Sequence, residues 1–328
     1  MHVVIYGAGA IGGVIGAHLF SSGTPTTLIA RGRHLEAIRT NGLVLDTAQG
    51  REALQIDTAA TASEIDWTDE SVVFLCVKSQ QTAAALEDLR FHAPPMTPIV
   101  SAQNGVANEP AILRLFPNVY SLCVVLPALH LDPGVVIQLS DGTPGLLDIG
   151  RYPTGFDDTA ETIAARLRAA SFPSKVRGNI TAWKYRKLIT NLVNGVDATY
   201  RNDGPAHHEL VRRARSEGEA VLDAADIEVI TEESDIARRA DFIKRRDTGD
   251  NSYGSSTWQS VERGAGSVEV DYLAGEIVLL GRLNGVPTPV NELVQAETVR
   301  LVRDGLPAAS LDAQEALARV GVTPPTAE

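Results

Sequence analysis

The chain has 328 residues, more than one hydrophobic core usually organises, so two domains are expected. Hydrophobic residues make up 44% of it, as in a soluble globular protein, and the net charge of −12 argues against general binding to nucleic acid or anionic membranes. No stretch is long and apolar enough to span a bilayer, and we expect a cytoplasmic protein. Cys76 and Cys123 lie in apolar runs that suit buried thiols, and no cluster has metal-ligand spacing, so no metal site is predicted.

A glycine motif opens the chain. Residues 2–6 predict a buried strand, residues 13–22 predict a helix, and between them stand Gly7, Ala8, Gly9, Ala10, Ile11 and Gly12. In this strand–turn–helix context GxGxxG is typical of dinucleotide binding. The first glycine permits the tight turn, the second leaves room for a pyrophosphate, and the third lets helix and strand pack closely, while the helix N-terminus offers N–H groups. A purely structural glycine turn is the alternative.

The second predicted strand, residues 25–30, bears on the choice of cofactor. Enzymes that select NAD usually carry a carboxylate near the end of this strand, but here it ends in Ala30 and is followed by Arg31 and Arg33. A guanidinium can pair with the 2′-phosphate of NADP(H). The sequence therefore favours NADPH, with Arg31 as a ligand, over a solvated loop arginine.

The first half continues as a doubly wound domain, expected over residues 1–178. Lys78 and Asn104 fall just beyond two predicted strands, at the sheet edge where open α/β folds bind ligands. An exposed lysine explains Lys78 equally well. The further predicted strands are 43–47, 53–57, 72–78, 97–103, then 120–131, 134–140 and 144–150 as antiparallel additions, and 172–177, with helices at 82–90 and 156–170.

The second half, residues 179–328, is predicted to be an all-α domain. Beyond a helix at 183–194, helices are expected at 207–226, 231–246, 267–284 and 290–305, and the Gly- and Ser-rich residues 247–267 are expected to form a functional or mobile loop. Glu269 lies near the start of one of these helices, where a carboxylate favours the helix dipole.

The helix at 183–194 carries a polar row. Lys187, Asn191 and Asn194 fall within about 60° of arc, opposite an apolar face. An ordinary surface stripe would look similar, but Asn costs up to about 0.7 kcal/mol relative to Ala in a helix. One ammonium and two carboxamides suit the binding of a carbonyl and a neighbouring hydroxyl. Lys184, three residues before Lys187, is the fallback for the cation.

Taken together, the motifs resemble the ketopantoate reductases (2-dehydropantoate 2-reductases) along the whole chain. The segments that carry the resemblance are GAGAIG (7–12), ARGRHLEAIRTNGL (30–43), CVKSQQT (76–82), QNGV (103–106), WKYRKLITNLVN (183–194), SSTWQS (255–260), EVDYLAGEI (269–277) and GVPTPVN (285–291). The resemblance implies a Rossmann domain, a helical domain and an active site between them. It also implies NADPH-dependent reduction of ketopantoate to pantoate, a step of pantothenate and coenzyme A biosynthesis.

The resemblance also implies roles for single residues. Lys187 matches the general acid, Asn191 a substrate-binding asparagine, and Asn104 the asparagine that meets nicotinamide and substrate. Lys78 matches a lysine near the cofactor, and Glu269 a glutamate at the cofactor-facing side of the site. Ser256, with Thr257 as the alternative, matches the serine that holds the substrate carboxylate.

One departure from the family concerns the substrate's distal hydroxyl. The family commonly has a second asparagine eight residues after the lysine, where this chain has Gly195, while Asn194 lies one position earlier. The alternatives are therefore another 2-oxo acid, a cyclic imine, or a non-catalytic NADP(H)-binding sensor. A small-molecule 2-oxo acid is the expected partner, and the oligomeric state stays open, with a homodimer as one alternative.

Overall fold

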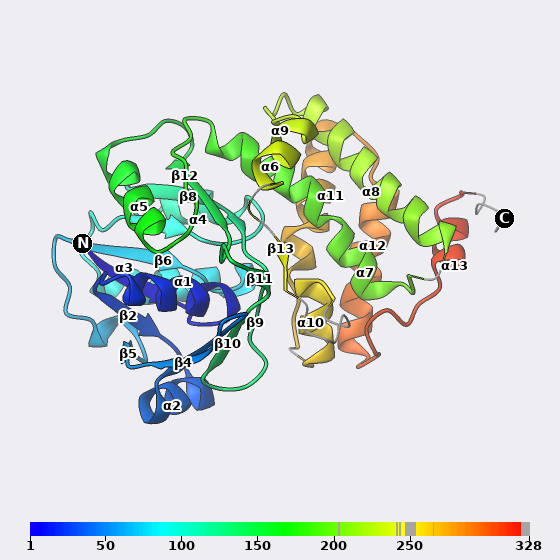
Figure 1. Cartoon of the computed structure of the whole chain (residues 1–328). Coiled ribbons are helices and arrows are strands. Elements are labelled where there is room, and N and C mark those ends of the chain that lie inside the picture. The colour runs from blue at the N-terminus through cyan, green and yellow to red at the C-terminus, as the bar shows by residue number, and fades with distance from the viewer. Residues whose placement is uncertain (203, 241, 243, 247–253, 265, 323–328) are drawn as a thin grey trace. The chain divides into compact units, whose positions relative to one another are not determined.

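The computed structural model describes residues 1–202, 204–240, 242, 244–246, 254–264 and 266–322 (Figure 1). The chain forms two compact units. The first comprises Met1–Lys184 and Thr231–Gly249, and the second comprises Tyr185–Ile230 and Asp250–Glu328. The single boundary predicted at residue 178 stays a prediction.

The first unit is built on a 7-stranded sheet in the order β12-β8-β7-β6-β1-β2-β5. All neighbouring strands are parallel except β12, which is antiparallel to β8. The doubly wound prediction is confirmed, whereas the prediction that β8 would be antiparallel is wrong. The strands are β1 (His2–Tyr6), β2 (Thr26–Ile29), β5 (Asp57–Ala59), β6 (Ser71–Leu75), β7 (Ile99–Ser101), β8 (Val119–Val125) and β12 (Leu146–Arg151).

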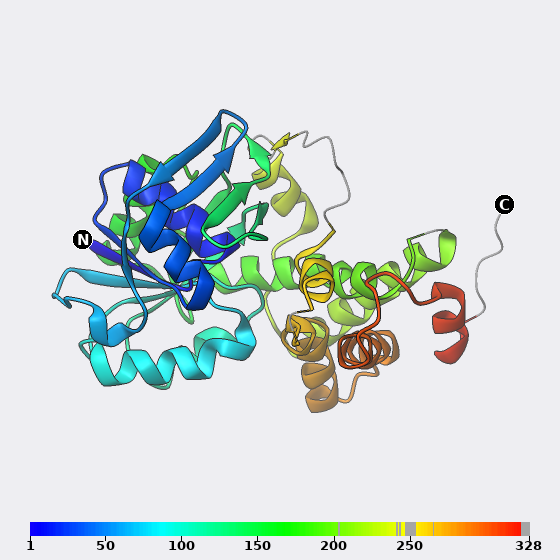
Figure 2. The same ribbon diagram turned by 90° about the horizontal axis from the view of Figure 1, so that it is seen from below.

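Helices cover both faces of this sheet. Successive side chains of a strand point to opposite faces, so Val3 and Ile5 join one core while Val4 and Tyr6 join another. The first core includes residues of α1 (Ala10–Ser21) and α5 (Asp158–Ala169), and the second those of α3 (Thr82–His92) and α4 (Asn108–Leu113). Figure 2 shows α3, in cyan, and α1, in blue, on opposite sides of the sheet. Because both faces are buried, the strands are continuous apolar runs.

A second sheet of 4 strands has the order β4-β3-β10-β9. Its strands are β3 (Leu43–Thr47), β4 (Gly50–Leu54), β9 (Ala128–Leu129) and β10 (Val135–Gln138). The helix α1 packs against this sheet as well, so closely that a Cβ on Gly13 would lie 2.6 Å from Val136 Cγ1. The prediction that these later strands would finish the main sheet is therefore wrong for β9 and β10.

Two other expectations for the first unit are corrected. Residues 172–177 form no named strand, only a single bridge from Val176 to Ile149. The helix predicted at 231–246 ends early, as α9 (Glu232–Arg239), and is followed by β13 (Lys244–Arg245), which pairs with β11 (Ser140–Asp141).

Buried ion pairs hold the segment that contains α9 and β13 against the rest of the first unit. The Asp148 carboxylate on β12 is fully buried and accepts two hydrogen bonds from Arg238, at 3.0 and 2.7 Å, and two from Arg177. Arg246 donates to Asp46 at 2.8 Å. Because a buried carboxylate without a partner is costly, these cations hold α9 and β13 in place.

The described part of the second unit is helical, as predicted. It contains α7 (Val193–Thr199), α8 (Pro205–Ala224), α10 (Ser256–Glu262), a 3₁₀ turn (Glu269–Tyr272), α11 (Ala274–Asn284), α12 (Pro289–Arg303) and α13 (Ala313–Arg319), while α6 (Ile180–Asn191) begins in the first unit. The predicted single helix through residue 194 is wrong, because α6 ends at Asn191. The predicted loop at 247–267 contains α10, and its residues 247–253 and 265 lie outside the described part.

The segment GVPTPVN has a structural explanation. Gly285, in the left-handed region at φ +69°, ends α11, and Pro289 opens α12. The Glu217 carboxylate on α8 accepts the N–H groups of Val290 and Asn291, at 2.8 and 3.0 Å, and so caps α12.

Candidate active site

The three glycines of the first turn have three different environments. Gly7 has φ +104°, and a Cβ there would lie 2.8 Å from Val77 Cγ1. A Cβ on Gly12 would lie 2.2 Å from the Gly7 carbonyl oxygen, whereas one on Gly9 would meet nothing within 4 Å. No side chain caps the N-terminus of α1, and its first turn carries no acidic residue. Open space beside the N–H groups of a helix start is what a pyrophosphate requires, so these residues fit the predicted dinucleotide.

Arg31 stands at the end of β2, directly before α2 (Gly32–Asn41). Its side chain is exposed, and Nη2 donates to the Tyr6 hydroxyl at 3.1 Å, which in turn donates to Asp88 at 2.7 Å. Burial and the Asp88 carboxylate raise the pKa of Tyr6 to about 12, so the phenol stays neutral at physiological pH. The guanidinium is thus anchored at a strand end where Ala30 supplies no competing carboxylate.

The ends of β6 and β7 lie side by side and carry Lys78 and Asn104, which are both half-buried. Two buried carboxamides tie these ends together. Gln103 Nε2 donates to the Val77 carbonyl at 2.8 Å, and Asn108 Nδ2 donates to Ser79 Oγ at 3.0 Å and to the Asn104 carbonyl at 3.3 Å. Sequence reasoning missed both supporting amides, although Gln103 stands inside the QNGV motif.

Lys184, the alternative candidate for the catalytic cation, takes part in a buried ion pair instead. Its side chain is buried, its ammonium forms an ion pair with Glu109 on α4, and it also donates to the Gln103 carbonyl at 3.2 Å. Ser121 Oγ donates to the same carboxylate at 3.2 Å. Because this ammonium is held inside the first unit, the geometry argues against Lys184 as a proton donor to a substrate.

Lys187 and Asn191 lie one turn apart on α6, and Asn194 follows on α7. The Asn194 carbonyl accepts a hydrogen bond from Ser255 Oγ at 3.2 Å, and Ser255 is also the N-cap of α10. The contact brings the start of α10, where Ser256 lies, next to α7. Ser256 is exposed, whereas its alternative Thr257 is buried at 3% exposure.

Glu269 and Gly195 belong to the same unit. Glu269 opens the 3₁₀ turn that packs against α11 and α12, and its side chain is half-buried. A Cβ on Gly195 would lie 2.7 Å from Val294 Cγ1 on α12. An asparagine at residue 195 would therefore require the two helices to move apart.

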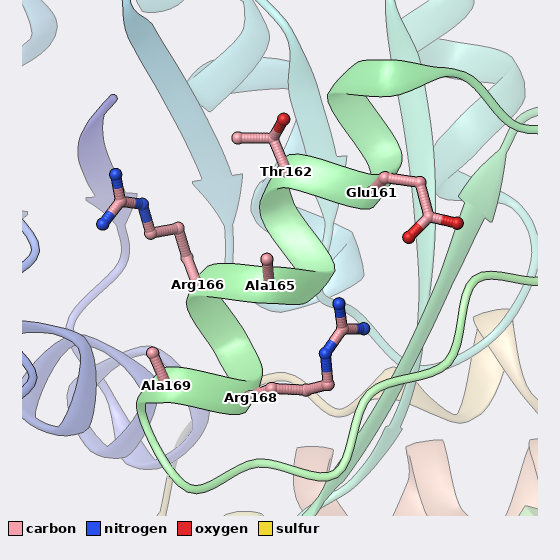
Figure 3. A pocket seen from close by; sticks show the side chains of 6 residues that line it. All are labelled: Glu161, Thr162, Ala165, Arg166, Arg168 and Ala169. Atoms are coloured by element: carbon pink, nitrogen blue, oxygen red, sulfur yellow. The ribbon is translucent and has the colours of Figure 1, made fainter.

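A surface depression on α5 contains none of the predicted site residues (Figure 3). It is open to solvent and is lined by Glu161, Thr162, Ala165, Arg166, Arg168 and Ala169. Among the described residues, no group of three or more His, Cys, Asp or Glu side chains could hold a metal ion. None of the described helices is long and apolar enough to cross a membrane.

Comparison with known proteins gives matches along nearly the whole chain. Residues 3–154 match the family model Ketopantoate reductase PanE/ApbA, and residues 179–300 match Ketopantoate reductase PanE/ApbA C terminal. The 2-dehydropantoate 2-reductase of Pyrococcus horikoshii is 30% identical over 307 residues, which cover 90% of this chain and 96% of the relative.

Solved structures of related proteins have a similar fold over nearly the whole chain. A PanE/ApbA family ketopantoate reductase from Ralstonia eutropha JMP134 is similar with a TM-score of 0.77 and 29% identity, covering 93% of this chain and 99% of the other. D-mandelate dehydrogenase in a ternary structure with NADH and anilino(oxo)acetate shares the fold, with a TM-score of 0.81, 23% identity and the same coverage. The chain therefore belongs to the ketopantoate reductase family and is an oxidoreductase that uses a nicotinamide dinucleotide.

Proposed function

We propose that this protein uses NADPH to reduce a 2-oxo acid to the 2-hydroxy acid, and that its substrate is 2-dehydropantoate, reduced to pantoate. The observation that carries the proposal is the pair Lys187 and Asn191 on α6. Both halves of the chain match the ketopantoate reductase family, which supports the same function. Membership of an oxidoreductase family leaves the non-catalytic sensor without support.

The first unit would hold the cofactor. The N–H groups at the start of α1 and the open space at Gly9 suit the pyrophosphate. Arg31 would pair with the 2′-phosphate, because its guanidinium is exposed and no carboxylate stands at the end of β2 to repel that group. Lys78 and Asn104, at neighbouring strand ends, would bind near the nicotinamide end. When bound, the dinucleotide supplies the hydride that adds to the substrate's carbonyl carbon.

The second unit would supply the proton. As the carbonyl carbon is reduced, negative charge grows on its oxygen, and the Lys187 ammonium stabilises this charge and donates a proton to it. Asn191, together with Asn104, would orient the carbonyl through its carboxamide. Ser256, exposed at the start of α10, would hold the substrate carboxylate.

Two further side chains complete the proposed constellation. Glu269 would orient the bound groups at the cofactor-facing side. Asn194 would meet the substrate's distal hydroxyl, one position earlier than the asparagine that the family commonly carries.

A second candidate function is the reduction of a 2-oxo acid that lacks the distal hydroxyl. It is favoured by the packing of Gly195 against Val294, which leaves no room at residue 195 for a side chain that would bind this hydroxyl. A cyclic imine is a less supported alternative, because the row of ammonium and carboxamides suits a carbonyl oxygen.

One assay separates these functions. NADPH oxidation would be followed with 2-dehydropantoate, with 3,3-dimethyl-2-oxobutanoate, which differs only by lacking the hydroxyl, and with a cyclic imine. Loss of a hydrogen bond to a buried site corresponds to about a tenfold or larger drop in kcat/KM. The kcat/KM for 2-dehydropantoate should therefore exceed that for 3,3-dimethyl-2-oxobutanoate by about tenfold or more. Equal rates would favour the second candidate, and turnover of the imine alone would overturn both.

A further inference from the structure

A histidine on α2 bridges the glycine turn and a loop far along the chain. The ring of His34 contacts the Ala8 carbonyl oxygen through Nε2 at 2.7 Å, and the backbone N–H of Gly134 donates to its Nδ1 at 2.8 Å. The approach is close, since a Cβ on Gly134 would lie 2.9 Å from Ala37 Cβ on α2. The ring is half-buried, and Gly134 is buried.

This bridge requires a neutral imidazole. A carbonyl oxygen can only accept, so Nε2 must carry the hydrogen, and a backbone N–H can only donate, so Nδ1 must present its lone pair. In the protonated ring both nitrogens carry hydrogens, and the Gly134 N–H would then face another N–H. Protonation of His34 therefore breaks the bond to the loop even if the bond to Ala8 survives.

The bond to Ala8 also controls a donor of the turn. The Ala8 carbonyl and the Gly9 N–H belong to one planar trans peptide group and point in opposite directions. When His34 holds the carbonyl toward α2, the Gly9 N–H is directed the other way. Gly9 is the N-cap of α1 and the position at which added atoms would meet nothing within 4 Å.

The surroundings of His34 disfavour its charge. The ring of His130 lies 4.2 Å away, centroid to centroid, and its Nδ1 donates to the Val135 carbonyl of its own loop at 3.0 Å. Burial lowers the pKa of His34 below its ordinary value of 6.5, and His130 lowers it further. The other charged residues of the two elements that meet here, Arg33, Glu36 and Arg39 on α2 and Asp132 on the loop, are all exposed. The glycine turn itself carries no titratable side chain.

We infer that His34 is a positioning residue of the dinucleotide site: its neutral ring aims the Gly9 N–H at the cofactor and makes cofactor affinity fall in acid. The inference rests on the proposed placing of the pyrophosphate at the glycine turn. The hydrogen bonds of His34 determine the direction in which cofactor affinity changes with pH. Because the bridged ring must be neutral, its contribution is fully present above pH 6.5, and it is lost as the pH falls toward the lowered pKa of His34.

The experiment measures NADPH affinity by fluorescence titration at intervals from pH 7.5 to about 5.5, with folding checked by circular dichroism at each pH. His34→Gln supplies one donor and one acceptor but does not titrate, so it should bind like the wild type at pH 7.5. At about 5.5 the wild type should have lost affinity by up to about tenfold more than His34→Gln. The 2′-phosphate of NADPH titrates in both proteins and cancels in this ratio.

Two more variants complete the test. His34→Ala should bind NADPH about tenfold more weakly than the wild type at every pH, because the Ala8 carbonyl loses its donor. His208→Gln, which changes an exposed histidine of α8 in the second unit, should follow the wild type throughout. A wild-type to His34→Gln ratio that is constant with pH, or wild-type affinity in His34→Ala, would overturn the inference.

A further variant, Gly9→Ala, tests separately whether the pyrophosphate binds at the glycine turn. Gly9→Ala puts a methyl group into the open space of the turn, so it should abolish NADPH binding if the pyrophosphate lies there. If Gly9→Ala binds normally, the placement fails, and the inference fails with it. If Gly9→Ala does not bind and the His34 variants behave like the wild type, only the role of His34 is refuted.

Discussion

Lys184 and Glu109 form a buried ion pair beside the turn that carries Asn104. The two side chains are 5% and 1% exposed, so neither charge has water as an alternative partner. The ammonium also holds the Gln103 carbonyl, directly before Asn104. Lys184, three residues before Lys187 on α6, therefore has a structural role.

Breaking this ion pair should destabilise the protein. Glu109→Gln leaves the Lys184 ammonium buried without a counter-charge, which typically costs about 3–5 kcal/mol in the free energy of unfolding. Urea denaturation followed by circular dichroism measures this loss. The double variant Lys184→Met with Glu109→Leu replaces both charges by apolar groups and should recover most of it. A single variant as stable as the wild type would show that the pair contributes nothing.

Lys187→Ala should lower kcat by about 10²–10⁴-fold, because no ammonium then stabilises and protonates the growing oxyanion. NADPH affinity should stay within about twofold of the wild type, since the proposed cofactor site lies in the first unit. The matched control is Lys175→Ala, which removes an exposed ammonium from the first unit. Stopped-flow measurement of NADPH oxidation under saturating substrate tests this directly. Full kcat in Lys187→Ala would refute the role of general acid.

Arg31→Gln should weaken NADPH binding by about 10- to 100-fold, the equivalent of one or two hydrogen bonds to a charged group. NADH lacks the 2′-phosphate, so its dissociation constant should change little, and the ratio of the two constants is the quantity to measure. Arg39→Gln is the control, because Arg39 is also exposed on α2 but pairs with Glu64. Equal loss of both cofactors in Arg31→Gln would mean that Arg31 does not select between them.

Alanine at two glycines of the turn should give opposite phenotypes. Gly12→Ala forces its methyl group against the Gly7 carbonyl and the side chains of Ile5 and Cys76, so the melting temperature should fall by several degrees. Gly9→Ala meets no protein atom, so the melting temperature without cofactor should match that of the wild type while NADPH no longer stabilises the protein. Differential scanning fluorimetry with and without NADPH records both. An equally low melting temperature for both variants would contradict this account.

The parts of the fold that depend on short sequence separations were predictable. The glycine turn is one contiguous motif, and the buried parallel strands are apolar runs between helices, so β1, α1, β2 and β6 follow from local pattern. The end of α6 at Asn191 did not follow, because the apolar periodicity continues unbroken through Leu192 and Val196.

Pairings between distant residues could not be predicted. The partner of Lys184 lies 75 positions away, and β13 has only two residues whose partners stand about a hundred positions earlier. The second sheet likewise forms from short strands that are equally suited to the edge of the main sheet. For the candidate site, residue types and order were available from the sequence, whereas Gln103 and Asn108 became visible only through their hydrogen bonds.

The return of α9 and β13 to the first unit has a practical consequence for dissecting this protein. A fragment that stops after Lys184 would expose the edge of β11 and leave Asp148 with Arg177 but without Arg238. A fragment that starts at Tyr185 would contain α9 and β13 without the part of the first unit against which they pack. The first unit is therefore built from two separate stretches of the chain, and a soluble version of it should require residues 231–246 to be joined back by a designed linker or supplied as a complementing peptide.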